Sequence, residues 1–139
     1  MLKLFPFFLV LVILPVGACP RDFGQLASRL AKDLHHYINR SYTKFAIPVY
    51  AQTVSLPELE PLPVQEADPS IQQLFLKITH RRSGELQLES QSYWLFLVST
   101  PQGWRLAMAF TRVGEAPPID VSEGAVADAV KAWLRDNCR

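Results

Sequence analysis

Histidine is the side chain best suited to acid–base chemistry near neutral pH, and the sequence has three. His35 and His36 are adjacent in a region of helical periodicity, so they lie about 100° apart around the helix axis and cannot converge on one ligand. We expect both to be solvated or boundary side chains. His80 begins a predicted turn, and we expect it to be exposed. Without a His-x-x-x-His or Cys-x-x-Cys spacing, the sequence predicts no metal site.

Other catalytic patterns are also missing from the sequence. It has neither the Gly-x-Ser-x-Gly of a serine hydrolase nor a Gly-x-Gly-x-x-Gly phosphate loop. The pairs Glu58/Glu60 and Glu85/Glu89 have the spacing of extended or strand surfaces, which favours solvated carboxylates over a hydrolytic pair. We therefore predict no catalytic residue and no cofactor, and we favour a non-enzymatic protein over an enzyme.

The two cysteines, Cys19 and Cys138, allow two exclusive kinds of chemistry. Residues 16–19, Val-Gly-Ala-Cys, resemble a bacterial lipobox, which implies lipidation of Cys19 and a membrane tether. Alternatively, the two cysteines form a disulfide, because they lie near the two ends of the chain that follows residue 18. An alkylated sulfur cannot join a disulfide, and lipidation would leave Cys138 as a free thiol. We favour the disulfide.

Residues 1–18 have the pattern of an export signal. Lys3 provides a basic start, an apolar run covers residues 4–14, and small or modest side chains precede Cys19. The apolar run is about half the roughly 20 residues that a membrane-spanning helix needs. We expect export to a periplasmic, lumenal or secreted location, with membrane attachment only if Cys19 is lipidated.

The remaining residues, 19–139, are enough for one domain and too few for two. The formal net charge of the whole chain is +1, and leaving out Lys3 in the leader balances basic against acidic residues. This neutrality argues against nucleic acid as a partner. A sequon, Asn39-Arg40-Ser41, falls within a predicted helix and matters only in a eukaryotic host.

Helical periodicity is clear at both ends of this domain. From Pro20 to about Tyr42, apolar side chains recur at spacings of three and four. Asp120 and Glu123 have the spacing of a capping box and predict the start of a second helix. The two expected stripes are Phe23, Leu26, Ala27, Leu30, Leu34, Tyr37 and Ile38, and then Val126, Ala129, Val130, Trp133 and Leu134.

Between the helices, the pattern predicts four antiparallel strands. Residues 45–54 read as a strand in which Pro48 indicates an edge or a bulge, and a Pro- and Glu-rich loop follows at about 55–70. Residues 71–113 read as a three-stranded meander. A three-residue first loop at 82–84, with Gly84 left-handed, pairs Ile78 with Leu88. A second turn at 100–103 sets the register of the last two strands.

That second turn pairs Leu97 with Leu106, and by continuation Tyr93 with Phe110. Both faces of the resulting ribbon, residues 93–110, are then apolar, so each must be covered. We expect one helix on each side, which gives an α+β domain with an N-terminal helix, a four-stranded antiparallel sheet and a C-terminal helix.

The aromatic side chains of this ribbon are the candidate ligand or partner surface, although core packing is the commoner explanation for such residues. A protein-binding surface would be any part of the ribbon that the C-terminal helix leaves open. A ligand pocket would instead lie beneath the first helix, near small side chains such as Ala109. The candidates are Tyr93, Trp94, Phe96, Trp104 and Phe110.

The segments 103–112 and 132–138 resemble a group of small exported proteins of cyanobacteria, with similarity over residues 93–139. This resemblance implies a periplasmic, lumenal or membrane-tethered location and no catalytic residues. More distantly, a helix across a curled sheet is similar to cystatin-like and nuclear-transport-factor-like rolls. The inhibitory Gln-x-Val-x-Gly of cystatins is missing, because residues 52–56 read Gln-Thr-Val-Ser-Leu. No inward-pointing Asp/His pair of the nuclear-transport-factor-like enzymes is evident either.

We therefore expect an exported, non-enzymatic α+β domain that binds an unknown protein or envelope component. The alternative is a small-molecule-binding or enzymatic pocket in an α+β roll.

Overall fold

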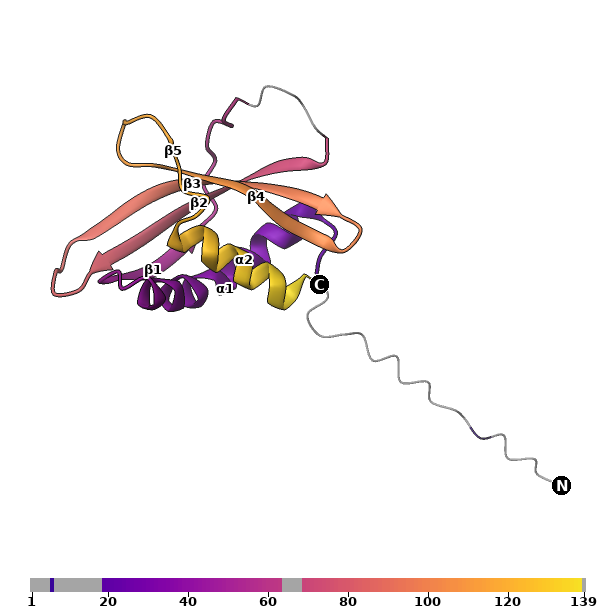
Figure 1. Cartoon of the computed structure of the whole chain (residues 1–139), viewed down its shortest axis with the longest axis horizontal. Helices are drawn as coiled ribbons and strands as arrows, with labels where there is room; N and C mark the ends of the chain where they lie inside the picture. The colour runs from indigo at the N-terminus through magenta and orange to yellow at the C-terminus, as the bar shows by residue number, and fades with distance from the viewer. Residues whose placement is uncertain (1–5, 7–18, 64–68, 139) are drawn as a thin grey trace.

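The computed structural model describes residues 6, 19–63 and 69–138 of the chain (Figure 1). The predicted leader therefore lies outside the described residues except for Pro6, as do residues 64–68 of the predicted loop. The elements are, in order, α1 (Phe23–Lys44), β1 (Val49–Ser55), β2 (Ile71–Arg82), β3 (Leu88–Thr100), β4 (Gly103–Arg112), β5 (Ile119–Asp120) and α2 (Ala125–Asn137).

The strands form one antiparallel sheet in the order β1-β2-β3-β4-β5, so the expected α+β class is confirmed. The sheet has five strands rather than the predicted four, because the short β5 pairs with β4 at Phe110 and Thr111. β1 is an edge strand that begins directly after Pro48 and has a register shift between Ala51 and Thr53. The edge position expected from Pro48 is thus confirmed.

The two helices have the buried stripes that their periodicity predicts. α1 begins after Asp22, whose carboxylate accepts a hydrogen bond from the backbone N–H of Gln25 at 2.9 Å. The predicted capping box of α2 is wrong. α2 begins after Gly124, and Asp120 lies in β5, where its carboxylate accepts from the Ser122 N–H at 2.8 Å. Hydrogen bonding from the side chain and the backbone N–H of Ser122 lowers the pKa of Asp120.

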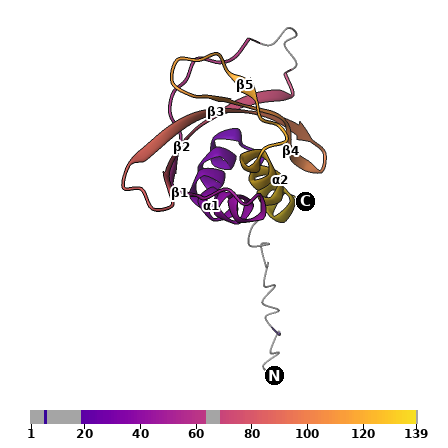
Figure 2. The ribbon, with the colours of Figure 1, turned by 60° about the vertical axis from the view of Figure 1, so that its left-hand side comes forward.

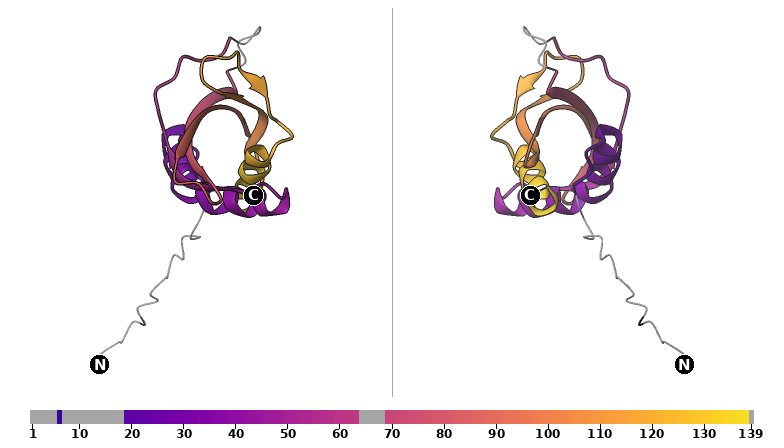
Figure 3. Two further views of the ribbon diagram at one scale, coloured as in Figure 1. Left: turned by 90° about the vertical axis from the view of Figure 1, so that its left-hand side faces the viewer. Right: turned by 90° about the vertical axis from the view of Figure 1, so that its right-hand side faces the viewer.

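Both helices lie on the same, concave face of the curled sheet (Figures 2 and 3), so the expectation of one helix on each side is wrong. We call this the inner face. The outer face is covered instead by residues 56–63, which we call the arm. The Trp94 indole donates to the Glu60 carbonyl at 2.9 Å, and the Gln73 amide exchanges two hydrogen bonds with the backbone of Leu62, at 2.8 and 2.9 Å.

The first hairpin has a longer loop than the sequence suggested. Gly84 has the expected positive φ of 85°, but Ile78 pairs with Gln91 rather than with Leu88, which pairs with Arg81. The observed register sets Leu76 opposite Tyr93, and both are buried, while Leu88 is 56% exposed. The fold therefore leaves two apolar residues of the hairpin tip, Leu86 and Leu88, exposed and buries a larger set nearer the centre.

The second hairpin follows the predicted register only near its turn. Leu97 pairs with Leu106 as expected, but a bulge at the next residue sets Phe96 opposite Met108 rather than Ala107. The predicted pairing of Tyr93 with Phe110 is therefore wrong. Because the bulge exchanges the two faces, Phe110 lies on the outer face with its ring centroid 5.7 Å from that of Phe96.

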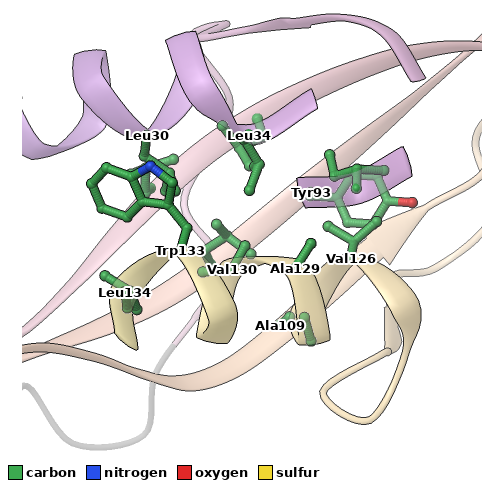
Figure 4. Close-up of a cluster of buried hydrophobic side chains, with 14 of the residues drawn as sticks. Leu30, Leu34, Tyr93, Ala109, Val126, Ala129, Val130, Trp133 and Leu134 are labelled. Carbon is green, nitrogen blue, oxygen red and sulfur yellow. The ribbon is translucent and has the colours of Figure 1, made fainter. Parts of the chain in front are cut away.

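The core fills the space between the inner face and the two helices (Figure 4). Trp133 of α2 is fully buried, and its indole donates to the Asp33 carboxylate of α1 at 3.1 Å. A disulfide joins Cys19 to Cys138, with 4.5 Å between their Cα atoms. The favoured disulfide is thus present, and it connects the segment before α1 to the end of α2.

Candidate functional site

Four of the five predicted aromatic side chains are buried, so the ribbon has no broad exposed aromatic surface. Tyr93 and Trp104 face the inner core, while Trp94 and Phe96 face outward beneath the arm. Each of these four is at most 5% exposed. Phe110 is half-buried on the outer face. The pocket expected beneath the first helix near Trp94 and Phe96 is also wrong, because both point away from α1.

One part of the ribbon does border an open groove. The groove has a volume of about 570 Å³ and lies between the first half of β4 and the second half of α2. Its apolar floor consists of buried Trp104, Leu134 and Cys138 with half-buried Leu106. The indole of Trp104 donates to the Pro20 carbonyl at 3.0 Å, which fixes this floor next to the disulfide.

The rim of this groove is basic. Arg105, Lys131 and Arg135 line it and are exposed, and none of the described lining residues is acidic. Arg135 has the carboxylate of Asp136 3.7 Å from its guanidinium, and Asp136 also accepts a hydrogen bond from Tyr37. Both groups of this ion pair are about half exposed, so solvent weakens the attraction and leaves Arg135 available.

The groove also runs beside an unpaired strand edge. β5 covers β4 only at Phe110 and Thr111, and the adjoining Ala109 is bonded to the Ser122 hydroxyl and the Val121 N–H. Among the described residues, none pairs with the edge of β4 that faces away from β3, from Trp104 to Ala107. The backbone groups of this edge can therefore pair with another extended chain.

A second concavity, which we call the inner cavity, lies at the opposite end of the helical layer. Its volume is about 300 Å³, and it is bordered by the end of α1, the β2–β3 hairpin and the start of α2. Its polar lining side chains are Tyr42, His80, Arg82, Glu89, Gln91 and Tyr93.

His80 corrects a sequence-based expectation. We expected His80 to be exposed at a turn, but it is only 9% exposed, because it lies within β2 on the same inner face as Ile78, with its ring centroid 6.4 Å from that of Tyr42 in α1. His35 and His36 agree with their expectation: His35 is half-buried and His36 exposed, with their ring centroids 3.8 Å apart on α1. Asn39, the first residue of the sequon, exchanges two hydrogen bonds with the Ala51 backbone. Its side-chain amide therefore links α1 to β1.

The remaining candidates are the two pairs of carboxylates. Glu58 and Glu60 are exposed on the arm, and Glu85 and Glu89 are exposed in the first hairpin. Within residues 19–63 and 69–138, no three His, Cys, Asp or Glu side chains come together as metal ligands would. In the same part of the chain, no helix has the length and apolar character to cross a membrane.

Sequence reasoning missed the basic rim and the inner cavity. Lys131 and Arg135 are four residues apart, so they occupy one stripe of α2, and this signal was available. Arg105 lies near these two side chains only because α2 packs along β4, which the sequence alone does not show. The inner cavity unites side chains from α1, β2 and β3, and it depends on the hairpin register that the sequence left open.

Comparison with known proteins found no matching family, no matching characterised sequence and no matching solved structure. The resemblances to exported cyanobacterial proteins and to cystatin-like or nuclear-transport-factor-like rolls therefore stay predictions.

Proposed function

We propose that this chain is an exported, non-enzymatic binding domain that holds an extended acidic segment of a partner protein in the groove between β4 and α2. The observation that carries the proposal is the coincidence of three features: an unpaired edge of β4, an apolar floor at Trp104, and a basic rim without acidic residues. Strand addition uses such an edge for backbone hydrogen bonds and the neighbouring pockets for side chains.

The three features have different roles in this proposal. The β4 edge from Trp104 to Ala107 supplies backbone hydrogen bonds, which give affinity without much sequence preference. Burial of an apolar partner side chain on Leu134 and Trp104 adds to that affinity. Lys131 and Arg135 favour acidic partners and speed association, an effect that salt weakens.

Export is the second part of the proposal. The leader pattern of residues 1–18 predicts secretion, and the Cys19–Cys138 disulfide is of a kind that persists in oxidising compartments. Both observations support a periplasmic, lumenal or secreted location. Membrane attachment through Cys19 requires molecules in which this disulfide is absent.

The test uses two synthetic eight-residue peptides of alternating valine and charged residues, one with glutamate and one with lysine, followed by fluorescence anisotropy. We expect the glutamate peptide to bind and the lysine peptide not to bind, with affinity that falls as salt is raised. N-methylation of alternate backbone nitrogens should abolish binding, because the peptide then cannot donate to β4. Equal binding of the two charged peptides would refute the proposed partner chemistry.

A pair of charge-reversal variants places the binding in the groove. Lys131→Glu with Arg135→Glu should weaken the glutamate peptide at least about tenfold through lost attraction and added repulsion. The matched control is Lys77→Glu with Arg81→Glu, which makes the same charge change on exposed residues of β2, outside the groove. If both double variants lower the affinity equally, only net charge matters and the groove is not the site.

A further inference from the structure

We infer that the inner cavity is a second binding site, which takes a small zwitterion with a carboxylate and an ammonium group on an apolar body, such as a free apolar amino acid. This site is independent of the groove and goes beyond the proposed protein partner. It lies at the opposite end of α2, where that helix begins. Its volume of about 300 Å³ is at the lower end of the range for small-molecule sites.

Tyr42 indicates that the cavity is built to receive a polar group. Its side chain is only 6% exposed, and its hydroxyl has no hydrogen-bond partner among the described residues. Among the described residues, every side-chain N or O atom that is closed off from solvent has a hydrogen-bond partner. The Tyr42 hydroxyl has none, so it is not closed off, and we infer that it opens onto the cavity that Tyr42 lines. Burial raises the pKa of Tyr42, which keeps the hydroxyl a hydrogen-bond donor.

The start of α2 adds donors to the same cavity. Gly124, Ala125 and Val126 line it, and the N-cap Gly124 has no side chain to accept the first backbone N–H groups of the helix. The positive end of the helix dipole also favours an anion there. Together with the Tyr42 hydroxyl and the Arg82 guanidinium, these N–H groups suit a carboxylate.

His80 and Glu89 provide the opposite chemistry. The Nδ1 of His80 lies 3.3 Å from the Ile78 carbonyl, which can only accept, so in the neutral ring Nδ1 carries the hydrogen and Nε2 is an acceptor. Glu89 pairs with His80 across β2 and β3, and its carboxylate adds a negative charge on the same inner side. These two acceptors suit an ammonium group.

The charges of Arg82 and Glu89 are both available to a ligand. They line one cavity, yet no ion pair joins them or links either to another described residue. One positive and one negative side chain make the cavity neutral overall, which matches a zwitterion better than a single anion. Apolar contacts come from Ile47, Val49, Val121 and Val126.

The test is calorimetric titration of the full domain with three probes of the same carbon skeleton. Leucine carries both charged groups, isocaproate lacks the ammonium and isopentylamine lacks the carboxylate. We expect leucine to bind at least about tenfold more tightly than either analogue, because each charge-assisted hydrogen bond contributes to affinity. Failure of all three to bind, or binding of isocaproate as tight as that of leucine, would overturn the inference.

Two variants with neighbouring controls locate the charges. Arg82→Gln should weaken leucine binding about tenfold, whereas Arg81→Gln, on the outer face of the same strand, should leave it unchanged. Glu89→Gln should have the same effect as Arg82→Gln, with Glu85→Gln in the exposed loop as its control. Equal effects of the variant and its control would refute the assignment.

Tyr42→Phe separates a binding role from a structural one. Because the hydroxyl makes no hydrogen bond to the described residues, its loss should not lower the unfolding midpoint in urea. The same change should weaken leucine binding about fivefold by removing one donor. A variant that binds leucine as well as the unsubstituted protein would exclude this hydroxyl from the site.

Discussion

The two faces of the sheet are both apolar, but they are covered in different ways. Against the inner face, α1 and α2 pack a continuous layer of side chains that includes fully buried Leu30, Leu34 and Trp133 (Figures 2 and 4). Against the outer face, the arm is an extended segment pinned by the hydrogen bonds of Gln73 and Trp94. The arm, residues 56–63, forms neither a helix nor a strand.

The difference explains where open surface remains. Two helices cannot cover the whole width of a curled sheet, so the helical layer leaves the inner cavity at one end of α2 and the groove at its other end. The arm accepts hydrogen bonds from Trp94 and Gln73 of the outer face and donates one to Gln73. Both candidate sites consequently border the helical layer.

The largest expected effect is on the disulfide that clamps the inner layer. Replacing both Cys19 and Cys138 by alanine should lower the free energy of unfolding by about 4–5 kcal/mol, because the bond closes a loop across 119 residues. Urea unfolding of the double variant and of the reduced parent protein measures this change. Hydrogen exchange should increase in α1 and α2 more than at the arm, and an equal increase at the arm would contradict the separation of the two covers.

Adjacent residues on β3 test the two faces directly. Leu95 is fully buried on the inner face, and Phe96 is 2% exposed on the outer face. Leu95→Ala should cost about 3–4 kcal/mol, because the helices cannot move into the cavity that it leaves. Phe96→Ala should cost about 3 kcal/mol, at the low end for a buried phenylalanine, since the extended arm can collapse inward. Urea unfolding measures both values, and a larger loss for Phe96→Ala would show that the arm is as rigid as the helices.

Two glycines with positive φ test how closely the inner layer approaches the β3–β4 turn. A Cβ added to Gly103, at φ 116°, would lie 2.6 Å from the Cys138 carbonyl oxygen, whereas one on Gly84, at φ 85°, would meet nothing within 4 Å. Gly103→Ala should therefore cost about 2–3 kcal/mol and Gly84→Ala about 1 kcal/mol. Thermal unfolding compares the two, and equal losses would mean that the end of α2 is not held against this turn.

The smallest effect concerns the arm. Gln73→Leu removes both hydrogen bonds to the Leu62 backbone and should lower the free energy of unfolding by about 1 kcal/mol. It should also speed proteolytic cleavage near residues 58–60. The control is Gln72→Leu, an exposed neighbour with no such bond among the described residues. Unchanged cleavage of Gln73→Leu would show that Gln73 does not hold the arm.

Strong local patterns predicted most of the fold. Apolar residues at helical spacing identified both helices, Pro48 identified an edge strand, and Thr100-Pro101-Gln102-Gly103 gave the correct turn. The errors came where alternatives have similar local energies. A hairpin loop of three residues and one of six can both place Gly84 at a positive φ, so the glycine does not decide the loop length. The bulge after Leu106 cannot be recognised in the sequence, because the residues of β4 are apolar on both faces there.

The candidate sites depended on those same undecided features. Trp104 was a candidate from its sequence and does border the groove, but Lys131 and Arg135 join it only because α2 lies along β4. His80 lies on the same face of β2 as Ile78 in either register, but Glu89 lies opposite His80 only in the observed one.

The sequence alone predicted both helices, four of the five strands and the apolar character of both sheet faces, and it favoured a disulfide over lipidation of Cys19, because these follow from residue type and spacing. Tertiary structure alone decided that both helices share one face, that the Pro-rich arm covers the other, and which polar groups meet in the gaps. The reason is energetic: an apolar surface gains nearly the same free energy from any cover that excludes water. One arrangement is selected only by comparing the total free energy of every way in which the helices and the arm could cover both faces of the sheet.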